Sequence, residues 1–198
     1  MFPTLVWRAE LAEDAHTRVN ASVLKALAEL RQSLPPLEPG EGWQSKQDLH
    51  KSGSFIELVD GVNAATVEFL DILKIGYEGF AITGCWLNVL APGRAHRTHR
   101  HPNNFLSGVY YAQTQAGADT VNFHDPRAQS RIIRPPVTEL TADNTDQVVV
   151  KVRNGTLLLF PAWLEHSVDE NRSAEERISV SFNVMFTGYI ETMSEPMW

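Results

Sequence analysis

From residue 85 to residue 186 the chain is a series of short segments rich in β-branched and aromatic residues, with no helical pattern between them. Clusters of Pro, Gly, Asn and Asp separate the segments. The expected strands are 85–90, 96–101, 106–112, 120–124, 148–152, 156–160 and 177–186. Because parallel strands need long crossover segments, usually helices, this pattern predicts an antiparallel sandwich or barrel.

One turn within this region can be assigned more closely. Asn154 and Gly155 stand between two apolar segments, and both residue types tolerate a positive φ angle. A two-residue turn of this composition is a strong short-range signal for a β-hairpin. The sequence therefore predicts that strands 148–152 and 156–160 pair with each other.

The first 80 residues have apolar side chains at helical spacing. One helix is expected over 11–34, ended by Pro35 and Pro36, and a second from about 62 to 77, with glycines following it. Both helices are expected to serve packing. We therefore predict one domain, residues 1–198, which is mainly β with N-terminal helices. Residues 1–82 form its helical layer and residues 83–198 its β core.

Composition excludes several classes of protein. The single cysteine, Cys85, rules out an internal disulfide framework and a Cys-rich zinc site. No apolar run approaches the ~20 residues that a membrane helix needs, and the N-terminus lacks a secretory pattern, so we expect a cytoplasmic protein without a membrane partner. With 17 basic and 24 acidic residues the net charge is −7, which argues against a nucleic-acid partner.

Histidine is the residue type with an unusual distribution. Of seven histidines, three (His96, His99 and His101) fall within six residues. On a regular strand His99 and His101 share one face, whereas His96 has the opposite parity and faces away. Two ligands from one strand and a third from elsewhere can occupy one face of a metal octahedron. The alternative is a solvated strand end, and the local pattern leaves both interpretations open.

A third ligand and a polar strand face are available later in the chain. His166 follows an apolar segment and a turn, where its side chain can face the interior. In the segment 177–183, Arg177, Ser179, Ser181 and Asn183 alternate with Ile178, Val180 and Phe182. The polar face lies either in water or along a wet cavity, with the apolar face then under the N-terminal helices. An arginine in such a cavity can hold a carboxylate by two parallel hydrogen bonds.

Four motifs occur in an order that resembles a known family. They are His99-Arg100-His101-Pro102, Ser107-Gly108-Val109-Tyr110-Tyr111, Phe160 to His166, and Arg177 to Asn183. This order resembles the iron(II)- and 2-oxoglutarate-dependent oxygenases of the prolyl-hydroxylase-like kind, in particular an uncharacterised bacterial branch with a His-x-His-Pro motif. The resemblance covers roughly the last 115 residues, and several motifs in order are far more specific than one.

The resemblance implies a double-stranded β-helix core, which is a cupin-like jelly roll, with Fe(II) as cofactor and 2-oxoglutarate as cosubstrate. It assigns the metal to His99, His101 and His166, and the cosubstrate to Arg177, Ser179, Asn88 and Tyr110. His101 stands where the wider superfamily has a carboxylate. Asp125 can supply a carboxylate from a neighbouring strand, although Asp125-Pro126 is typical of a turn.

The expected function is a dioxygenase that hydroxylates an unidentified small-molecule or peptide substrate while 2-oxoglutarate is decarboxylated to succinate. Two alternatives follow from the histidine at position 101. One is a cupin-like metal-binding module without oxygenase activity, which acts as a sensor or scaffold. The other is a dioxygenase that uses a three-histidine iron site and needs no 2-oxoglutarate. A homodimer is compatible with each of them.

Positive charge gathers near the expected site despite the acidic balance of the whole chain. The arginines concerned are Arg94, Arg97, Arg100, Arg127, Arg131 and Arg134. For most of them we expect a solvated position at a strand end. Any that converge on the mouth of a pocket favour an anionic ligand.

Overall fold

The computed structural model describes residues 3–127, 132, 135–141 and 143–190. Within them the strands form two antiparallel sheets. The six-stranded sheet has the order β1 (Trp7–Glu10), β8 (Thr156–Pro161), β5 (Leu106–Gln113), β10 (Arg177–Phe186), β3 (Phe80–Leu90), β2 (Gly42–Gln44). The four-stranded sheet has the order β4 (His96–His99), β9 (His166–Val168), β6 (Thr120–His124), β7 (Gln147–Lys151). This arrangement confirms the mainly β prediction and is the jelly roll that the resemblance implies.

The two predicted helices are present, with shifted ends. They are α1 (Glu13–Leu30) and α2 (Ile56–Ile72), and the short helices η1 (Leu49–Lys51), η2 (Gly53–Phe55) and α3 (Thr187–Ile190) accompany them. α2 begins and ends earlier than predicted, and Lys74 just beyond it has a φ angle of 55°, which a helix cannot continue. No helix in the described part of the chain is both long and apolar enough to cross a membrane.

The N-terminal part contributes strands as well as helices. β1 and β2 form the two outer strands of the larger sheet, paired with β8 and β3. The predicted division at residue 82 is therefore wrong, because it falls inside β3 and separates strands of one sheet. These outer strands are three and four residues long, too short to show a clear alternating pattern in the sequence.

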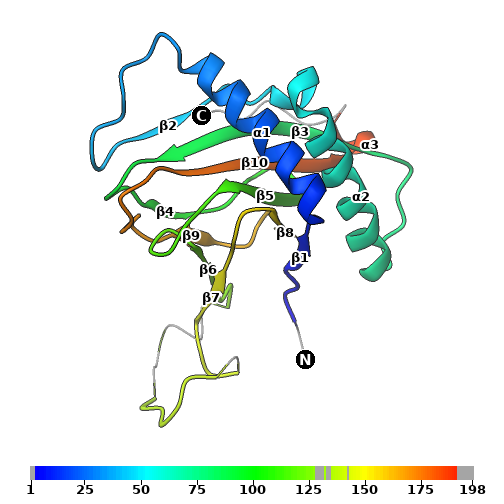
Figure 1. Ribbon diagram of the computed structural model, residues 1–198. Coiled ribbons are helices and arrows are strands. Elements are labelled where there is room, and N and C mark those ends of the chain that lie inside the picture. The colour runs from blue at the N-terminus through cyan, green and yellow to red at the C-terminus, as the bar shows by residue number, and fades with distance from the viewer. Residues whose placement is uncertain (1–2, 128–131, 133–134, 142, 191–198) are drawn as a thin grey trace.

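The helices cover one face of the larger sheet, and the smaller sheet lies on its other side (Figure 1). The helix-facing core contains Val180 and Phe182 from the central strand β10, packed with Val23 and Phe69 from the helices. Gly108 on β5 permits this packing, because a Cβ there would lie 2.2 Å from the Phe182 ring and 2.5 Å from a backbone oxygen. A second apolar cluster, which includes Tyr111 and Phe160, lies between the sheets.

The predicted hairpin between β7 and β8 is wrong, although its turn is present. β7 pairs with β6 in the smaller sheet, whereas β8 pairs with β1 and β5 in the larger one. Gly155 has a φ angle of 85°, and a Cβ at this position would approach the His16 side chain to 2.9 Å. The turn therefore carries the chain from one sheet to the other, which local turn chemistry cannot distinguish from a hairpin.

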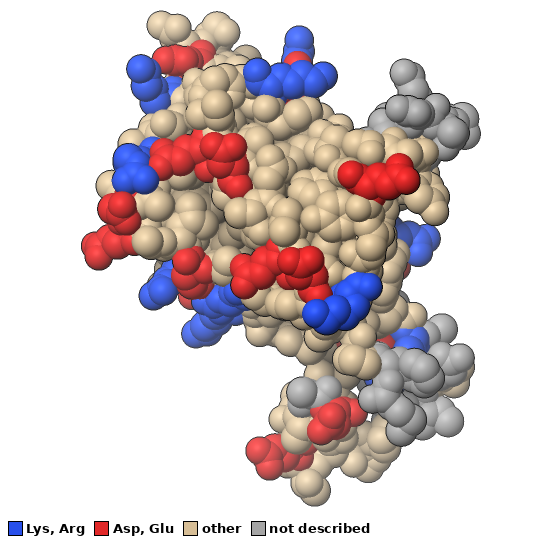
Figure 2. All heavy atoms as spheres, turned by 90° about the vertical axis from the view of Figure 1, so that its right-hand side faces the viewer, with Lys and Arg blue, Asp and Glu red and all other residues tan. Residues whose placement is uncertain are grey.

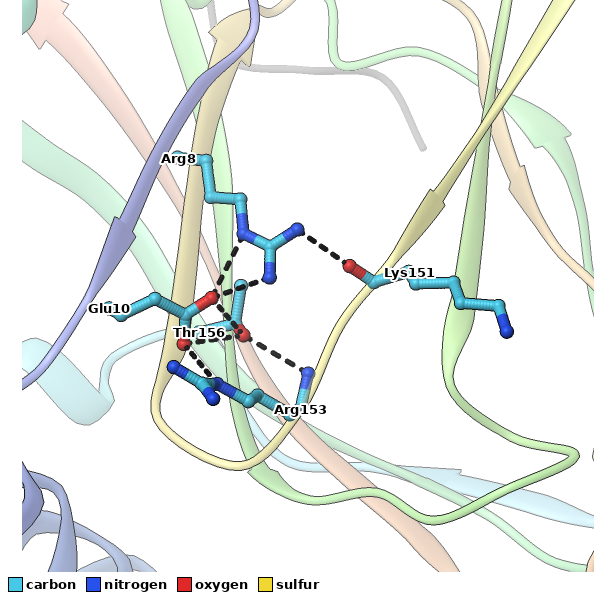
Figure 3. Close-up of polar contacts among 5 residues, drawn as sticks. All are labelled: Arg8, Glu10, Lys151, Arg153 and Thr156. Atoms are coloured by element: carbon cyan, nitrogen blue, oxygen red, sulfur yellow. Dashed lines mark hydrogen bonds and ion pairs between the residues drawn. The ribbon is translucent and has the colours of Figure 1, made fainter.

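A polar network holds this turn to the N-terminal strand (Figure 3). The Glu10 carboxylate accepts hydrogen bonds from Arg8 at 2.6 Å, Arg153 at 3.1 Å and the Thr156 hydroxyl at 3.0 Å. Arg8 also donates to the backbone oxygen of Lys151 at 2.9 Å. Burial opposes ionisation of Glu10, but these donors outweigh burial and lower its pKa. The network therefore joins β1 to the ends of β7 and β8.

Candidate metal and cosubstrate site

A cavity lies between the two sheets and holds about 440 Å³, including the part open to solvent. The space in which a water molecule can be centred is only about 40 Å³, well below the ~300–1,000 Å³ of pockets that enclose drug-sized ligands. The larger sheet contributes Asn88, Leu90, Gly108, Val109, Tyr111, Phe160, Arg177, Ser179 and Ser181. The other side of the cavity is formed by His96, His99, His101, Val121, His166 and Val168. Polar and apolar walls thus enclose one space that is reached from outside.

Three of these histidines converge. His99 on β4 is paired directly with His166 on β9, and their ring centroids are 4.3 Å apart. The ring of His101, just beyond β4, lies 5.1 Å from that of His99 and 5.3 Å from that of His166. One potential ligand atom from each ring lies within 4.8 Å of the others, and no other such group of His, Cys, Asp or Glu occurs in the described residues. Three imidazoles so placed suit a divalent metal ion and leave positions open for other ligands.

Backbone contacts orient two of the three rings. Nδ1 of His99 lies 2.8 Å from the carbonyl oxygen of Arg97, and Nδ1 of His166 lies 2.9 Å from that of Leu164. A carbonyl oxygen only accepts, so each Nδ1 carries the hydrogen and Nε2 keeps its lone pair for a metal. His101 makes no such bond within the described structure, and its ring packs against Trp86 at 5.8 Å.

Burial keeps the histidines neutral. Burial, together with the neighbouring His99, lowers the pKa of His101 to about 4 and that of His166 to about 3. At neutral pH these imidazoles are therefore unprotonated, which is the form that binds metal. The donor set fits an iron(II) ion, since imidazole nitrogen is one of its ordinary ligands.

Arg177 is the charged group in the wall of this cavity. It is 3% exposed, its Nε has no hydrogen-bond partner, and its guanidinium lies 5.1 Å from the centre of the Tyr111 ring. No carboxylate of the described residues pairs with it. The guanidinium has a side-chain hydrogen bond with Tyr111, but no carboxylate balances its buried charge, and a bidentate carboxylate is its best complement. The cavity thus fits a ligand with a carboxylate at this end, such as 2-oxoglutarate.

Two of the other predicted cosubstrate residues, Ser179 and Asn88, also line the cavity. The Asn88 carboxamide is already held in a network. Its Oδ1 accepts from Gln44 at 2.7 Å and Trp86 at 3.2 Å, and its Nδ2 donates to the Ser181 hydroxyl at 2.9 Å. The amide has one remaining N–H that it can offer to a ligand.

The assignment of Tyr110 to the cosubstrate is wrong. Its hydroxyl donates to Oδ1 of Asn20 on α1 at 2.6 Å, and its ring lies in the helix-facing core. Tyr111, which the sequence analysis did not select, lines the cavity beneath Arg177. Strand register explains the exchange, because Tyr110 is opposite Val180, which faces the helices, and Tyr111 is opposite Ser179. The sequence alone does not show this face, because the pairing of two distant strands decides it.

His96 and Asp125 also differ from expectation. His96 was predicted to face away, yet it lines the cavity because the register of β4 shifts between His96 and His99. Such an irregularity breaks the period-two rule on which the prediction rested. Asp125 forms an ion pair with Arg127 at 2.7 Å and does not belong to the histidine group, so it does not replace the missing carboxylate.

The charges of the molecule are unevenly distributed. Arg94, Arg97 and Arg100 are exposed around β4, next to the histidines. α2 carries Glu57, Asp60, Glu68 and Asp71 and no Lys or Arg, and Figure 2 shows acidic side chains across this side of the molecule. Arg131 and Arg134 lie outside the described residues. Positive charge beside the cavity favours the approach of an anion.

Comparison with known proteins identifies a family for the chain. Residues 84–183 match the model of the family described as "Putative 2OG-Fe(II) oxygenase", which is half of the chain and spans β3 to β10. A jelly roll whose cavity gathers metal ligands and leaves positions open has the architecture of a non-haem iron oxygenase. This chain belongs to the 2OG-Fe(II) oxygenase family. It is therefore an oxidoreductase that uses iron(II) and 2-oxoglutarate, and the metal-binding module without oxygenase activity is not favoured.

Solved structures share the fold at low sequence identity. The carbocyclase SnoK from nogalamycin biosynthesis is 14% identical with a TM-score of 0.67, over 98% of this chain and 89% of that one. A prolyl-4-hydroxylase from Pseudomonas putida is 15% identical with a TM-score of 0.62, over 92% and 93%. HygX from Streptomyces hygroscopicus, solved with nickel and 2-oxoglutarate, is 12% identical with a TM-score of 0.63, over 93% and 83%. No protein of curated function matches the chain by sequence.

Proposed function

We propose that the protein hydroxylates a substrate C–H bond and couples this reaction to the decarboxylation of 2-oxoglutarate. The observation that carries the proposal is the sharing of one cavity by the histidine triad and by Arg177, whose Nε is unsatisfied and whose charge no carboxylate of the described residues balances. A metal-binding module without a cosubstrate has no need for a buried arginine in the same space. A dioxygenase that needs no 2-oxoglutarate likewise leaves that arginine without a ligand.

Each residue has a definable part in this function. His99, His101 and His166 would hold iron(II), while Arg177 and Ser179 would hold the distal carboxylate of 2-oxoglutarate, with Tyr111 beneath the guanidinium. Bound together, iron and cosubstrate supply the oxidation, in which O₂ gives one atom to succinate and one to the substrate, with release of CO₂. Apolar residues such as Val109, Val121 and Phe160 exclude water from the cavity.

The substrate is either a small molecule or a peptide. A Trichoplax adhaerens prolyl hydroxylase of similar fold is solved with a peptide fragment of hypoxia inducible factor, and HygX is solved with hygromycin B. Both kinds of ligand are therefore accommodated on this fold. The exposed arginines near β4 favour a substrate with negative charge.

The test combines binding and turnover on the purified protein. Under anaerobic conditions, iron(II) and 2-oxoglutarate should produce a metal-to-ligand charge-transfer band, and in air succinate should be released. Arg177→Ala should lose the band at the same cosubstrate concentration, whereas Arg18→Ala, which removes an exposed arginine on α1, should keep it. Metal binding without succinate release would support the non-catalytic module, and oxygen uptake without 2-oxoglutarate would support the third alternative.

A further inference from the structure

His96 is a fourth imidazole in the wall of the cavity. The shift in β4 brings it to the same side as His99, and the two rings meet edge to face with centroids 6.1 Å apart. His96 is not part of the group whose ligand atoms converge on one point. It therefore contacts the metal site without belonging to it.

His96 and Arg177 line the same cavity, His96 from the smaller sheet and Arg177 from the larger one. Arg177 is paired with Leu90 across β10 and β3, and His96 is paired with Val168 across β4 and β9. All four residues line the cavity. His101, by contrast, lies beyond His99 in the other direction along the chain and packs against Trp86. His96 thus contacts the ring of the metal ligand His99 and faces the same cavity as the Arg177 guanidinium.

The His96 ring has hydrogen-bonding capacity that the protein does not use. Within the described residues neither ring nitrogen has a hydrogen-bond partner. An imidazole in either tautomer has an N–H group that can donate a hydrogen bond. A carboxylate has about four acceptor positions, so a carboxylate at Arg177 can take a donor from a second side.

We propose that His96 donates a hydrogen bond to the distal carboxylate of 2-oxoglutarate, together with Arg177. His96 is then a cosubstrate-binding residue, and the cavity selects 2-oxoacids that carry a second carboxylate. This inference rests on the proposed function, because it concerns the same cosubstrate. It adds His96 to the cosubstrate-binding residues, although regular strand geometry would turn this side chain away from the cavity.

The experiment compares two 2-oxoacids on the iron(II)-loaded, anaerobic protein. 2-Oxoglutarate carries the distal carboxylate, and 2-oxopentanoate has the same chain without it. Dissociation constants are measured by calorimetry for wild type, His96→Ala and His96→Gln. His50→Ala is the matched control, since His50 is also half-buried with a pKa lowered by burial and an unpartnered Nδ1, yet lies outside the cavity.

His96→Ala should weaken 2-oxoglutarate binding roughly ten-fold or more, the usual effect of one hydrogen bond to a charged group. Binding of 2-oxopentanoate and of iron(II) should be unchanged, and His96→Gln should restore part of the loss. Unchanged affinity for 2-oxoglutarate, or an equal loss for both acids, would overturn the inference. Loss of iron would show that His96 is a metal ligand. If wild type bound neither acid, the proposed function would fail with it, whereas the other outcomes leave that function intact.

Discussion

The two faces of β10 differ in polarity, with apolar side chains on one and polar side chains on the other. Toward the helices it presents Ile178, Val180 and Phe182, all buried among hydrocarbon. Toward the smaller sheet it presents Arg177 and Ser179, which are also buried but line a cavity. Burial alone therefore does not separate the stabilising face from the functional one. The separating feature is whether the polar atoms have partners, and on the cavity side the Nε of Arg177 has none.

β5 shows the same difference between its two faces with two adjacent tyrosines. Tyr110 and Tyr111 are both completely buried, and burial raises the pKa of each. The Tyr110 hydroxyl is bonded to Asn20, whereas the Tyr111 ring lies beneath Arg177. Neighbours in sequence thus belong to different parts of the molecule, one to the helix packing and one to the site. The predictions below test this division through the free energy of unfolding.

The largest loss of unfolding free energy is expected at Phe182, on the face of β10 that packs against the helices. Phe182→Ala removes a fully buried ring from the centre of the larger sheet and should cost about 3–5 kcal/mol of unfolding free energy. Urea denaturation followed by circular dichroism measures it. Ser181 precedes Phe182 and lines the cavity, and Ser181→Ala should lower the free energy of unfolding much less. Equal losses at both positions would mean that the two faces are not distinct in their contribution to stability.

A smaller loss of unfolding free energy is expected from adding a methyl group to the contact between Gly108 and Phe182. Gly108→Ala places a Cβ 2.2 Å from the Phe182 ring and 2.5 Å from the backbone oxygen of Leu158, so both must move. Overpacking of this kind costs about 1–3 kcal/mol. Gly61→Ala in α2, where a Cβ meets nothing within 4 Å, is the control and should be neutral or stabilising. A neutral Gly108→Ala would show that β5 and β10 can separate without cost.

The two tyrosines should differ in what their substitution changes. Tyr110→Phe should lower the free energy of unfolding by about 1 kcal/mol and leave cosubstrate affinity unchanged. Tyr110→Phe removes the hydrogen bond to Asn20, and a typical buried hydrogen bond is worth about that much. Its affinity for 2-oxoglutarate, measured anaerobically by calorimetry, should equal that of wild type. Tyr111→Phe should instead alter cosubstrate affinity, since this hydroxyl is on the cavity side. The reverse pattern would restore Tyr110 as a cosubstrate residue.

Patterns of residue type predicted most of this fold. Alternation placed six side chains of β10, residues 177–182, on their observed faces, because this strand lies in the middle of the larger sheet. The approximate positions of both main helices followed from their apolar stripes. The pairing of β7 with β6 was missed, since a turn signal describes the local backbone and says nothing about which sheet receives the next strand.

The candidate site was predicted less completely, for a related reason. The convergence of His99, His101 and His166 agrees with the prediction, which rested on motif order and on the spacing of two of them. His96 and Tyr111 were missed because their faces depend on register. A shift in β4 turns one of them inward, and the pairing with β10 decides the other. Register is set by contacts between distant segments and is not visible in either segment alone.

The smallest change in the free energy of unfolding is expected at Arg177. The same substitution should have the largest effect on stabilisation by 2-oxoglutarate. Arg177 is a buried cation that no carboxylate of the described residues balances, and replacing it with the unbranched apolar side chain of Met removes a desolvation cost. The free energy of unfolding of Arg177→Met should therefore equal or exceed that of wild type. Wild type should gain about 2.7 kcal/mol when iron(II)-loaded protein is given 2-oxoglutarate at 100 times its dissociation constant. Arg177→Met should gain almost nothing under the same conditions, because the ligand has lost its carboxylate partner. A variant that was destabilised alone and still stabilised by 2-oxoglutarate would place Arg177 with the packing face, and the division between the two faces of β10 would not hold.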